Sequence, residues 1–363
     1  MLGSILIFLL VLSILVLVHE SGHFWVARKN GIWVEEFGFG LPPRVFGKKI
    51  GETIYSLNLF PFGGFVRLHG ENNEEEIEDP KRAFLGKSKK VRFAVIIAGV
   101  VMNFLLAVFA FAIIYSFSGI PRDTALVKVI DIASGSPAQS GGVVVGDIVK
   151  KVDGIEVKSV DGFIKRVEEK KGKRIEIEIE NEKKIKLTPR ENPPEGEGPL
   201  GVVISTTEIY FPPVWQRPFY GIYYGFKDAL FWGKTVILGF GSMLTNLFRG
   251  VVPQDVAGPV GIFAVTSEAA KIGVLALINF IGILSVNLAI LNILPFPALD
   301  GGRLLFIFIE KTIGRKVLPK VEAIIHSIGM IVLLLLLLAI TAHDIRRLIA
   351  AGGISGFIDS IAK

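Results

Sequence analysis

The most prominent feature of the chain is a series of long apolar segments separated by polar ones. A helix that crosses a bilayer core of ~30 Å needs roughly 20 apolar residues. Residues 93–117 alone provide 25 residues without a charge, which is roughly 37 Å of helix. By this criterion the pattern predicts four transmembrane helices, within residues 1–27, 93–117, 272–302 and 323–342.

A secretory signal peptide is the alternative interpretation of the first apolar segment. It would require a basic region at the start and a cleavage site of small residues at the end. Residues 1–18 carry no charge at all, and no such site follows them. We therefore predict a membrane helix that is retained in the protein.

A fifth apolar stretch, residues 229–248, is interrupted by Lys234, Gly239 and Gly241. Mixed patterns of this kind are typical of helices that lie along a membrane surface. We therefore predict an interfacial amphipathic helix within residues 208–271, and not a fifth span.

Residues 118–207, between the second and third spans, have the pattern of a small soluble domain. Apolar and polar residues alternate as in strands over residues 126–132 and 173–180, while residues 161–170 have helical periodicity. This predicts an inserted α+β domain, a half-open β-barrel with two helices, in an otherwise α-helical multi-pass membrane protein.

The segment between the first two spans, residues 28–92, contains two strand-like runs at residues 53–60 and 64–68. They are joined by a turn that includes Gly63 and Gly64. The hairpin is too apolar for a free loop, and irregular backbone is tolerated at membrane depth only where protein or a water-filled cavity satisfies it. We therefore predict a membrane-associated β-hairpin.

Composition supports the membrane interpretation. The chain is 51% hydrophobic and 20% charged, which disfavours both a wholly soluble globule and a disordered chain. The net charge of +6 comes from residues beside the spans, whereas residues 118–218 carry 16 basic and 16 acidic side chains. This distribution argues against nucleic acid as a partner. By the positive-inside rule, residues 28–92 and 303–322 are cytoplasmic, and residues 118–271 and both termini, including the tail 343–363, lie outside.

The first apolar segment ends in the sequence His19-Glu20-Ser21-Gly22-His23. On a helix the two histidines share a face, so both imidazoles can reach one Zn²⁺ with Glu20 near the metal. Ionisable residues within a membrane segment are costly and indicate function. Histidines that reach the interface beside Glu20 are the alternative.

A hydrolytic zinc site takes three protein ligands and leaves one position open. Because the chain has no cysteine, the third ligand must be a histidine or a carboxylate. His69, His326 and His343 are candidates by type. Asp300 is favoured because two prolines before it and two glycines after it end the third span at the depth of His19. The alternative is a solvated carboxylate at a helix end.

These motifs resemble the site-2 protease family of intramembrane zinc metalloproteases, in its bacterial regulator-of-sigma-E branch. The resemblance rests on H-E-S-G-H in the first span, N-x-x-P-x-P-x-L-D-G in the third, and the inserted domain between spans two and three, and it covers nearly the whole chain. It implies that the inserted domain is PDZ-like. A well-known enterobacterial member has two PDZ domains, whereas this chain has room for one.

The resemblance also implies site residues. His19, His23 and Asp300 would bind zinc, and Glu20 would be the general base, roles that the chemistry of zinc hydrolases also requires. Asn292 would bind the substrate backbone; a polar contact between membrane helices is its alternative, and Asn103 has the same two alternatives. The hairpin with Gly63 and Gly64 would offer an edge strand to the substrate.

The sequence therefore predicts a zinc endopeptidase of the bacterial inner membrane. Its expected substrates are single-span membrane proteins, with anti-sigma factors and remnant signal peptides implied by the resemblance. The alternatives are a catalytically idle PDZ-bearing scaffold, which would not need Glu20 and Asp300, and a metal transporter, which would need polar residues across the whole membrane. The sequence leaves the oligomeric state open.

Overall fold

The computed structural model describes residues 2–71, 77–180, 183–249, 258–315, 317–353 and 356–357. It contains two compact units. The first combines residues 1–117 with residues 218–363, and the second comprises residues 118–217. The candidate catalytic, metal-binding and substrate-binding residues predicted from the sequence all lie in the first unit.

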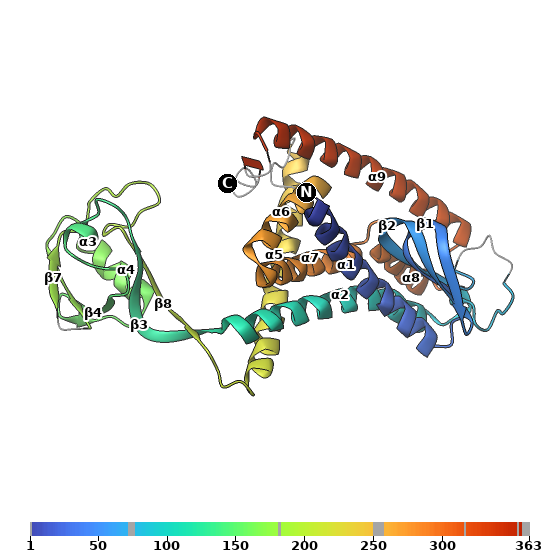
Figure 1. The fold of residues 1–363 in the computed structure, drawn as a ribbon, viewed down its shortest axis with the longest axis horizontal. Coiled ribbons are helices and arrows are strands. Elements are labelled where there is room, and N and C mark those ends of the chain that lie inside the picture. Colours follow the sequence, from blue (N-terminus) through green and yellow to red (C-terminus); the bar gives the residue numbers. More distant parts are fainter. Residues whose placement is uncertain are drawn as a thin grey trace. The chain divides into compact units, whose positions relative to one another are not determined.

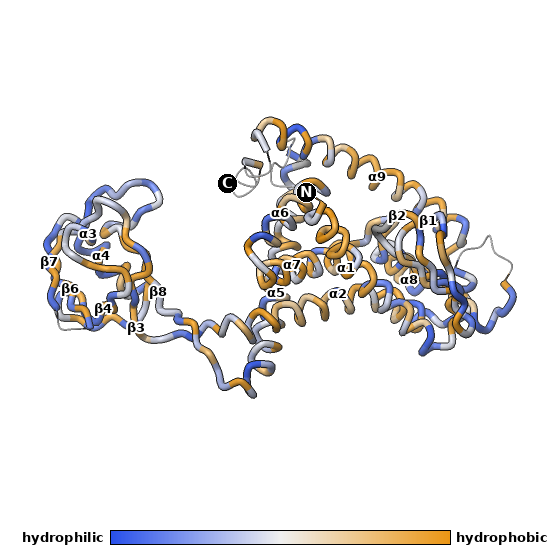
Figure 2. The backbone as a smooth tube through the Cα atoms, in the orientation of Figure 1, coloured by the Kyte–Doolittle hydropathy of each residue, from blue (hydrophilic) through white to orange (hydrophobic). Residues whose placement is uncertain are grey.

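Four helices of the first unit are long and apolar enough to cross a membrane: α1 (Leu2–Lys29), α2 (Lys89–Ser118), α7 (Val274–Ile293) and α9 (Pro319–Ala350). Hydrophobic residues, drawn in orange, predominate along these helices in Figure 2. Among the described residues, the prediction of four membrane-spanning helices is confirmed. The fourth helix continues to residue 350, eight residues beyond the predicted span, and residues 358–363 of the predicted tail lie outside the described residues.

Small residues bring the helices into close contact. At Gly22 of α1, a Cβ atom would overlap the carbonyl oxygen of Ala98 in α2. Close backbone approach at small residues is the usual way in which membrane helices pack, since lipid provides no hydrophobic driving force between them. The carboxyl-terminal half of α1 is therefore held directly against α2.

The region predicted as interfacial forms two helices, α5 (Arg217–Phe248) and α6 (Pro259–Ile272). Helix α5 begins well before the apolar stretch at residue 229. It packs against α2, because a Cβ atom at Gly221 or Gly225 would lie within 2.7 Å of Ala112 backbone atoms. A second contact joins Ala229 of α5 to Phe111 of α2 in one apolar cluster. The placement of α5 and α6 in the membrane interface stays a prediction.

The segment between α1 and α2 contains a sheet of two long strands, β1 (Val34–Ile50) and β2 (Thr53–Leu68), followed by a short 3-10 helix, η1 (Phe84–Gly86). Its cytoplasmic location stays a prediction. The prediction that residues 53–60 pair with residues 64–68 is wrong. Residues 36–39 lie between these two runs and pair with residues 54–57 on one side and 64–67 on the other. The tight turn of the hairpin is instead at residues 51–52. Residues 64–68 thereby form an outer arm of the sheet, which packs beside α1 (Figure 1).

The third span ends earlier than the sequence predicts. Helix α7 stops at Ile293, residues 294–299 are irregular, and α8 (Asp300–Ile313) follows. Asp300 is therefore the first residue of a new helix and does not lie in the turn that ends a longer span. Two prolines in the irregular segment explain the break, because proline cannot continue the hydrogen-bonding ladder of α7. Residues 303–313, predicted as loop, are helical.

The second unit contains a six-stranded sheet in the order β7-β6-β4-β3-β8, with β5 paired to β4. The strands are β3 (Ile120–Ile132), β4 (Ile148–Val152), β5 (Ile155–Glu156), β6 (Ile175–Ile179), β7 (Lys184–Leu187) and β8 (Val202–Tyr210); the helices are α3 (Pro137–Ser140) and α4 (Val160–Glu168). The apolar faces of both alternating runs are buried in its core. The predicted α+β arrangement is present, and its PDZ identity stays a prediction.

Candidate metal centre and adjoining pocket

His19 and His23 occupy successive turns of α1 and point to the same side. Their Nε2 atoms are 3.2 Å apart. Each side chain keeps only 12% of its surface exposed. The i, i+4 spacing on an unbroken helix therefore produces the paired arrangement that the sequence predicts.

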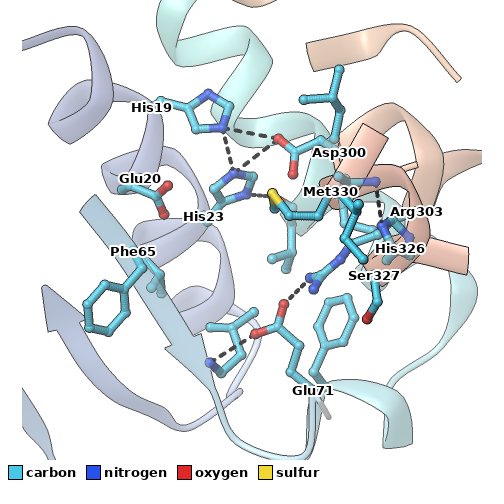
Figure 3. Close-up of a pocket in the computed structure, with 18 residues that line it drawn as sticks. His19, Glu20, His23, Phe65, Glu71, Asp300, Arg303, His326, Ser327 and Met330 are labelled. Atoms are coloured by element: carbon cyan, nitrogen blue, oxygen red, sulfur yellow. Dashed lines mark hydrogen bonds and ion pairs between the residues drawn. The ribbon is translucent and has the colours of Figure 1, made fainter. Parts of the chain in front are cut away.

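Asp300 reaches the same point from the start of α8. Its Oδ2 lies 3.1 Å from His19 Nε2 and 3.3 Å from His23 Nε2, as Figure 3 shows. The irregular segment before it makes this possible: Ala298 adopts a φ of 77° and donates its N–H to His326 Nδ1 at 2.9 Å. At Gly301 a side chain would overlap carbonyl oxygens at the end of α7, so α8 can begin there only because the residue is glycine.

Helix α2 forms the wall behind the two imidazoles. The Val95 carbonyl oxygen lies 2.8 Å from His23 Nδ1. One turn later, a Cβ atom at Gly99 would overlap His23 Nε2 and lie 2.6 Å from His19 Cε1. No local sequence signal marks Val95 or Gly99, because both act through the packing of α2 on α1.

A pocket of about 560 Å³ opens beside the three side chains. Glu20 lines it next to the histidines, and β2 contributes Phe65 (Figure 3). The other lining residues are Val66, Leu68, Glu71, Phe84, Val95, Ile96, Ala298, Leu299, Arg303, His326, Ser327, Met330 and Ile331. The pocket thus joins the outer arm of the sheet to the metal-ligand candidates.

An ion pair that the sequence does not predict connects the sheet region to α8. Arg303 pairs with Glu71, and Glu71 also accepts the backbone N–H of Leu68 at 3.3 Å. The neighbouring Glu71 carboxylate raises the pKa of the Arg303 guanidinium above its ordinary value. Arg303 therefore stays charged, and the end of the outer arm is fixed relative to the helix that begins with Asp300.

The remaining site candidates have different positions. Gly64 packs on α1, where a Cβ atom would lie 3.6 Å from Glu20 Cγ, whereas Gly63 has a φ of 85° and faces Leu41. Asn292 is half-buried in the last turn of α7 and is not among the residues that line the pocket. Gly64 therefore lies next to a site residue, and the substrate roles of all three stay predictions.

The alternative histidines do not join His19 and His23. His69 is buried and lies 2.7 Å from Glu35 through its Nδ1, and His343 is exposed on α9. His326 lines the pocket, but its Nδ1 is occupied by Ala298. Among the described residues, the histidines and carboxylates that could hold a metal together are His19, His23 and Asp300.

This group fits a zinc ion. Asp300 Oδ2 is buried and has no hydrogen-bond donor in the described part of the chain, although two imidazole nitrogens face it. Lone-pair donors that converge in this way are complementary to a cation. Two histidines and one carboxylate are also a ligand set that catalytic zinc takes, with a further position left open. Fold and site together define a membrane protein with a group of two histidines and one carboxylate that could hold a metal ion.

Comparison with known proteins places the chain in a family. The model of peptidase family M50 matches residues 7–336. A Clostridium perfringens protein named "Putative zinc metalloprotease CPE1693" is 37% identical over 93% of this chain and 97% of its own length. The zinc metalloprotease RasP of Geobacillus kaustophilus is 28% identical over 95% of this chain and 98% of its own length. The chain therefore belongs to peptidase family M50.

This membership confirms two predictions made from the motifs. The resemblance to site-2 proteases holds over nearly the whole chain, and the expected activity, hydrolysis of peptide bonds, is that of the family. The predicted cofactor, zinc, agrees with the names of the relatives and with the ligand types of the chain's own metal-binding group. The protein is a zinc-dependent membrane protease.

Proposed function

We propose that this protein is an intramembrane endopeptidase in which His19, His23 and Asp300 bind zinc and Glu20 is the general base. The observation that carries the proposal is the convergence of two Nε2 atoms and one carboxylate oxygen within 3.3 Å, from helices far apart in the sequence. The Glu20 carboxylate belongs to a residue that lines the pocket beside them. His19, Glu20 and His23 belong to α1, one of the four helices long and apolar enough to cross a membrane, which supports cleavage within or near the bilayer.

In the proposed mechanism the metal and the protein side chains have different roles. Bound zinc supplies a Lewis acid that activates water and polarises a carbonyl group. Glu20 takes a proton from the attacking water and delivers it to the nitrogen of the leaving amine. His19, His23 and Asp300 hold the metal, and their partly buried setting strengthens the electrostatic interactions on which this chemistry depends.

A transmembrane substrate must present its scissile bond as an extended segment, since a helix protects its own peptide bonds. The outer arm of the sheet, residues 64–68, ends at the pocket, so a substrate strand added along it would reach the metal centre. Gly63 and Gly64, which carry no side chains, would let the substrate backbone approach closely, and Asn292 would contact that backbone. Apolar side chains exposed on the sheet support its contact with lipid: Leu41, Val45, Phe46, Leu57, Leu59 and Phe60.

Metal removal tests the proposed function. Purified, detergent-solubilised protein should cleave a peptide that contains one membrane span, and a zinc chelator should abolish the cleavage. Added Zn²⁺ should restore it, because the chelator removes the metal and leaves the three ligand side chains in the protein. The measurement is the rate of product formation by mass spectrometry. Cleavage that persists at full rate in the chelator would exclude a metalloprotease, and no cleavage of any span peptide would favour the scaffold alternative.

Gly99 gives a structural test of the metal centre. Gly99→Ala should remove most of the bound zinc, because the new methyl group would overlap His23 and displace both imidazoles. Zinc per protein, measured by elemental analysis after purification, reports the loss. Gly239→Ala is the matched control: it also lies within a long helix, has open space at its Cβ, and should gain ~0.5–1 kcal/mol of stability with zinc unchanged. Normal zinc content in Gly99→Ala would contradict the proposed centre.

The substrates that we propose are anti-sigma factors and remnant signal peptides, in regulated intramembrane proteolysis. The PDZ-like domain, residues 118–207, either captures newly exposed C-termini or excludes bulky outer domains. We favour exclusion, because the chain lacks the Gly-Leu-Gly-Phe loop usual for carboxylate binding; Pro199-Leu200-Gly201-Val202 is only an approximate relative. In the same assay, a substrate with a folded outer domain should therefore be cut more slowly than the trimmed peptide. Equal cleavage rates for the two substrates would contradict the proposal that the PDZ-like domain excludes bulky outer domains.

We further propose that the protein lies in the bacterial inner membrane with both termini outside. Basic residues flank α1, α2 and α8 on the side assigned to the cytoplasm, including Arg28, Lys89 and Arg315. Alkaline phosphatase fused after Lys363 should be active, because that enzyme works only outside the cytoplasm, and the same fusion after Ser88 should be inactive. The reverse pattern would invert the topology.

A further inference from the structure

Asn103 is a buried polar residue of α2 for which the proposed mechanism has no use. Its side chain is completely inaccessible to solvent. It lies two turns after Val95 and one turn after Gly99, on the face of α2 that packs against the histidines of α1. Its carboxamide Nδ2 is 3.4 Å from His19 Nδ1.

We propose that Asn103 is a positioning residue that accepts a hydrogen bond from His19 Nδ1–H and thereby fixes His19 as a metal ligand. This inference rests on the proposed ligand role of His19. Neither the family match nor the names of the relatives assigns any role to Asn103.

A neutral imidazole carries one N–H, and the nitrogen that binds a metal must be the bare one. Because His19 Nε2 faces Asp300 Oδ2 and His23 Nε2, it is the ligand atom, and the hydrogen belongs on Nδ1. Ligand histidines almost always donate this second N–H to an acceptor, which orients the ring and strengthens the ligand.

His23 already has such an acceptor in the Val95 carbonyl oxygen, 2.8 Å from its Nδ1. The matching group for His19 is the Asn103 carboxamide. Residues 95 and 103 are two turns apart on α2, and residues 19 and 23 are one turn apart on α1. One face of α2 can therefore provide an acceptor to each imidazole ring. Gly99 lies between the two acceptors and leaves room for the rings.

Asn103 Oδ1 is the acceptor that remains. It is buried and has no hydrogen-bond donor in the described part of the chain. Rotation of the carboxamide by half a turn exchanges Oδ1 with Nδ2 and brings Oδ1 to His19 Nδ1 without displacing another residue.

The backbone around Asn103 is fixed. Ser285 of α7, itself fully buried, donates its hydroxyl hydrogen to the Asn103 carbonyl oxygen at 2.8 Å. Helix α7 leads through residues 294–299 to Asp300 at the start of α8. Asn103 of α2 contacts both His19 of α1 and Ser285 of α7, so these three helices meet at Asn103. Asn103 can therefore hold His19 in a set position relative to the third ligand.

Zinc affinity, measured by competition with a chromogenic chelator, tests the proposal without relying on activity. Asn103→Leu keeps the size of the side chain and removes the acceptor, so affinity should fall ~10–100-fold. Asn103→Asp keeps an acceptor at the same place and should bind zinc close to wild type. Thr266→Val is the control, because it replaces another fully buried polar side chain, one that bonds within its own helix. It should leave zinc affinity unchanged.

The outcomes separate this inference from the proposed function. If His19→Ala binds zinc as wild type does, the proposed ligand set fails. If His19→Ala loses zinc while Asn103→Leu keeps wild-type affinity, only the role of Asn103 is overturned. Equal losses in Asn103→Asp and Asn103→Leu would also overturn it, since an acceptor would then make no difference. Should Asn103→Leu not fold, Asn103→Ala provides the same contrast, with the melting temperature of each metal-free protein as the check on folding.

Discussion

Glu20→Gln should retain zinc, and its rate of peptide-bond cleavage should fall ~10²–10⁴-fold. The amide has nearly the size of the carboxylate but cannot take up a proton from the attacking water. Glu20 lines the pocket beside the metal-ligand candidates and is not one of them, so the metal centre should be unchanged. The measurement is the single-turnover cleavage rate of a span peptide, together with zinc per protein.

Glu52→Gln is the matched control for this substitution. Its side chain is 63% exposed and pairs with Arg82 in the turn region of the sheet, away from the pocket. The same chemical change there should leave the cleavage rate as in wild type. Equal rates for wild type and Glu20→Gln would refute the assignment of Glu20 as general base, whereas a loss of zinc in Glu20→Gln would mean that Glu20 is itself a ligand.

Asp300→Ala should lose zinc and, with it, activity. Removal of the carboxylate leaves only two imidazole nitrogens, fewer than the three protein ligands that a catalytic zinc site uses. The fall in zinc affinity should exceed the ~10–100-fold cost of losing a hydrogen bond that supports a ligand. Chelator competition measures it on the same scale as the variants of Asn103.

Asp161→Ala removes an exposed carboxylate in α4 of the second unit and should have no effect on zinc. Zinc affinity that is unchanged in Asp300→Ala would require another third ligand. The first candidate would then be His326, because it lines the same pocket and its Nε2 has no hydrogen-bond partner among the described residues. The double variant Asp300→Ala with His326→Ala would distinguish the two.

The sequence predicted those elements whose signal is local. Four spans follow from uninterrupted apolar length, which the described helices confirm. The paired histidines follow from helical spacing alone, since an i, i+4 pair on an unbroken helix must share a face. In the second unit, alternation and helical periodicity correctly located β6 and α4. In each case one segment carries the whole signal.

The errors concern relations between segments. Residues 53–60 and 64–68 have the composition of adjacent strands, but composition cannot reveal that residues 36–39 lie between them. Two prolines indicated that the third span ends near Asp300; they could not indicate that α8 begins at that residue, because helix formation there depends on glycines that pack against the end of α7. The pairing of Glu71 with Arg303, 232 residues apart, likewise has no local signal.

By itself the sequence determined the number of spans, the paired histidines with Glu20, and the ligand types left open by the absence of cysteine. Asp300 was favoured among several candidates, but no pattern could bring it to the histidines. The tertiary structure decided that Asp300 lies beside the histidines. It also decided that Gly99 leaves space for the imidazole rings, and that the Val95 carbonyl and the Asn103 side chain lie next to these rings on α2. The physical reason is that spacing along one helix fixes a face, whereas distances between helices depend on how closely their backbones pack.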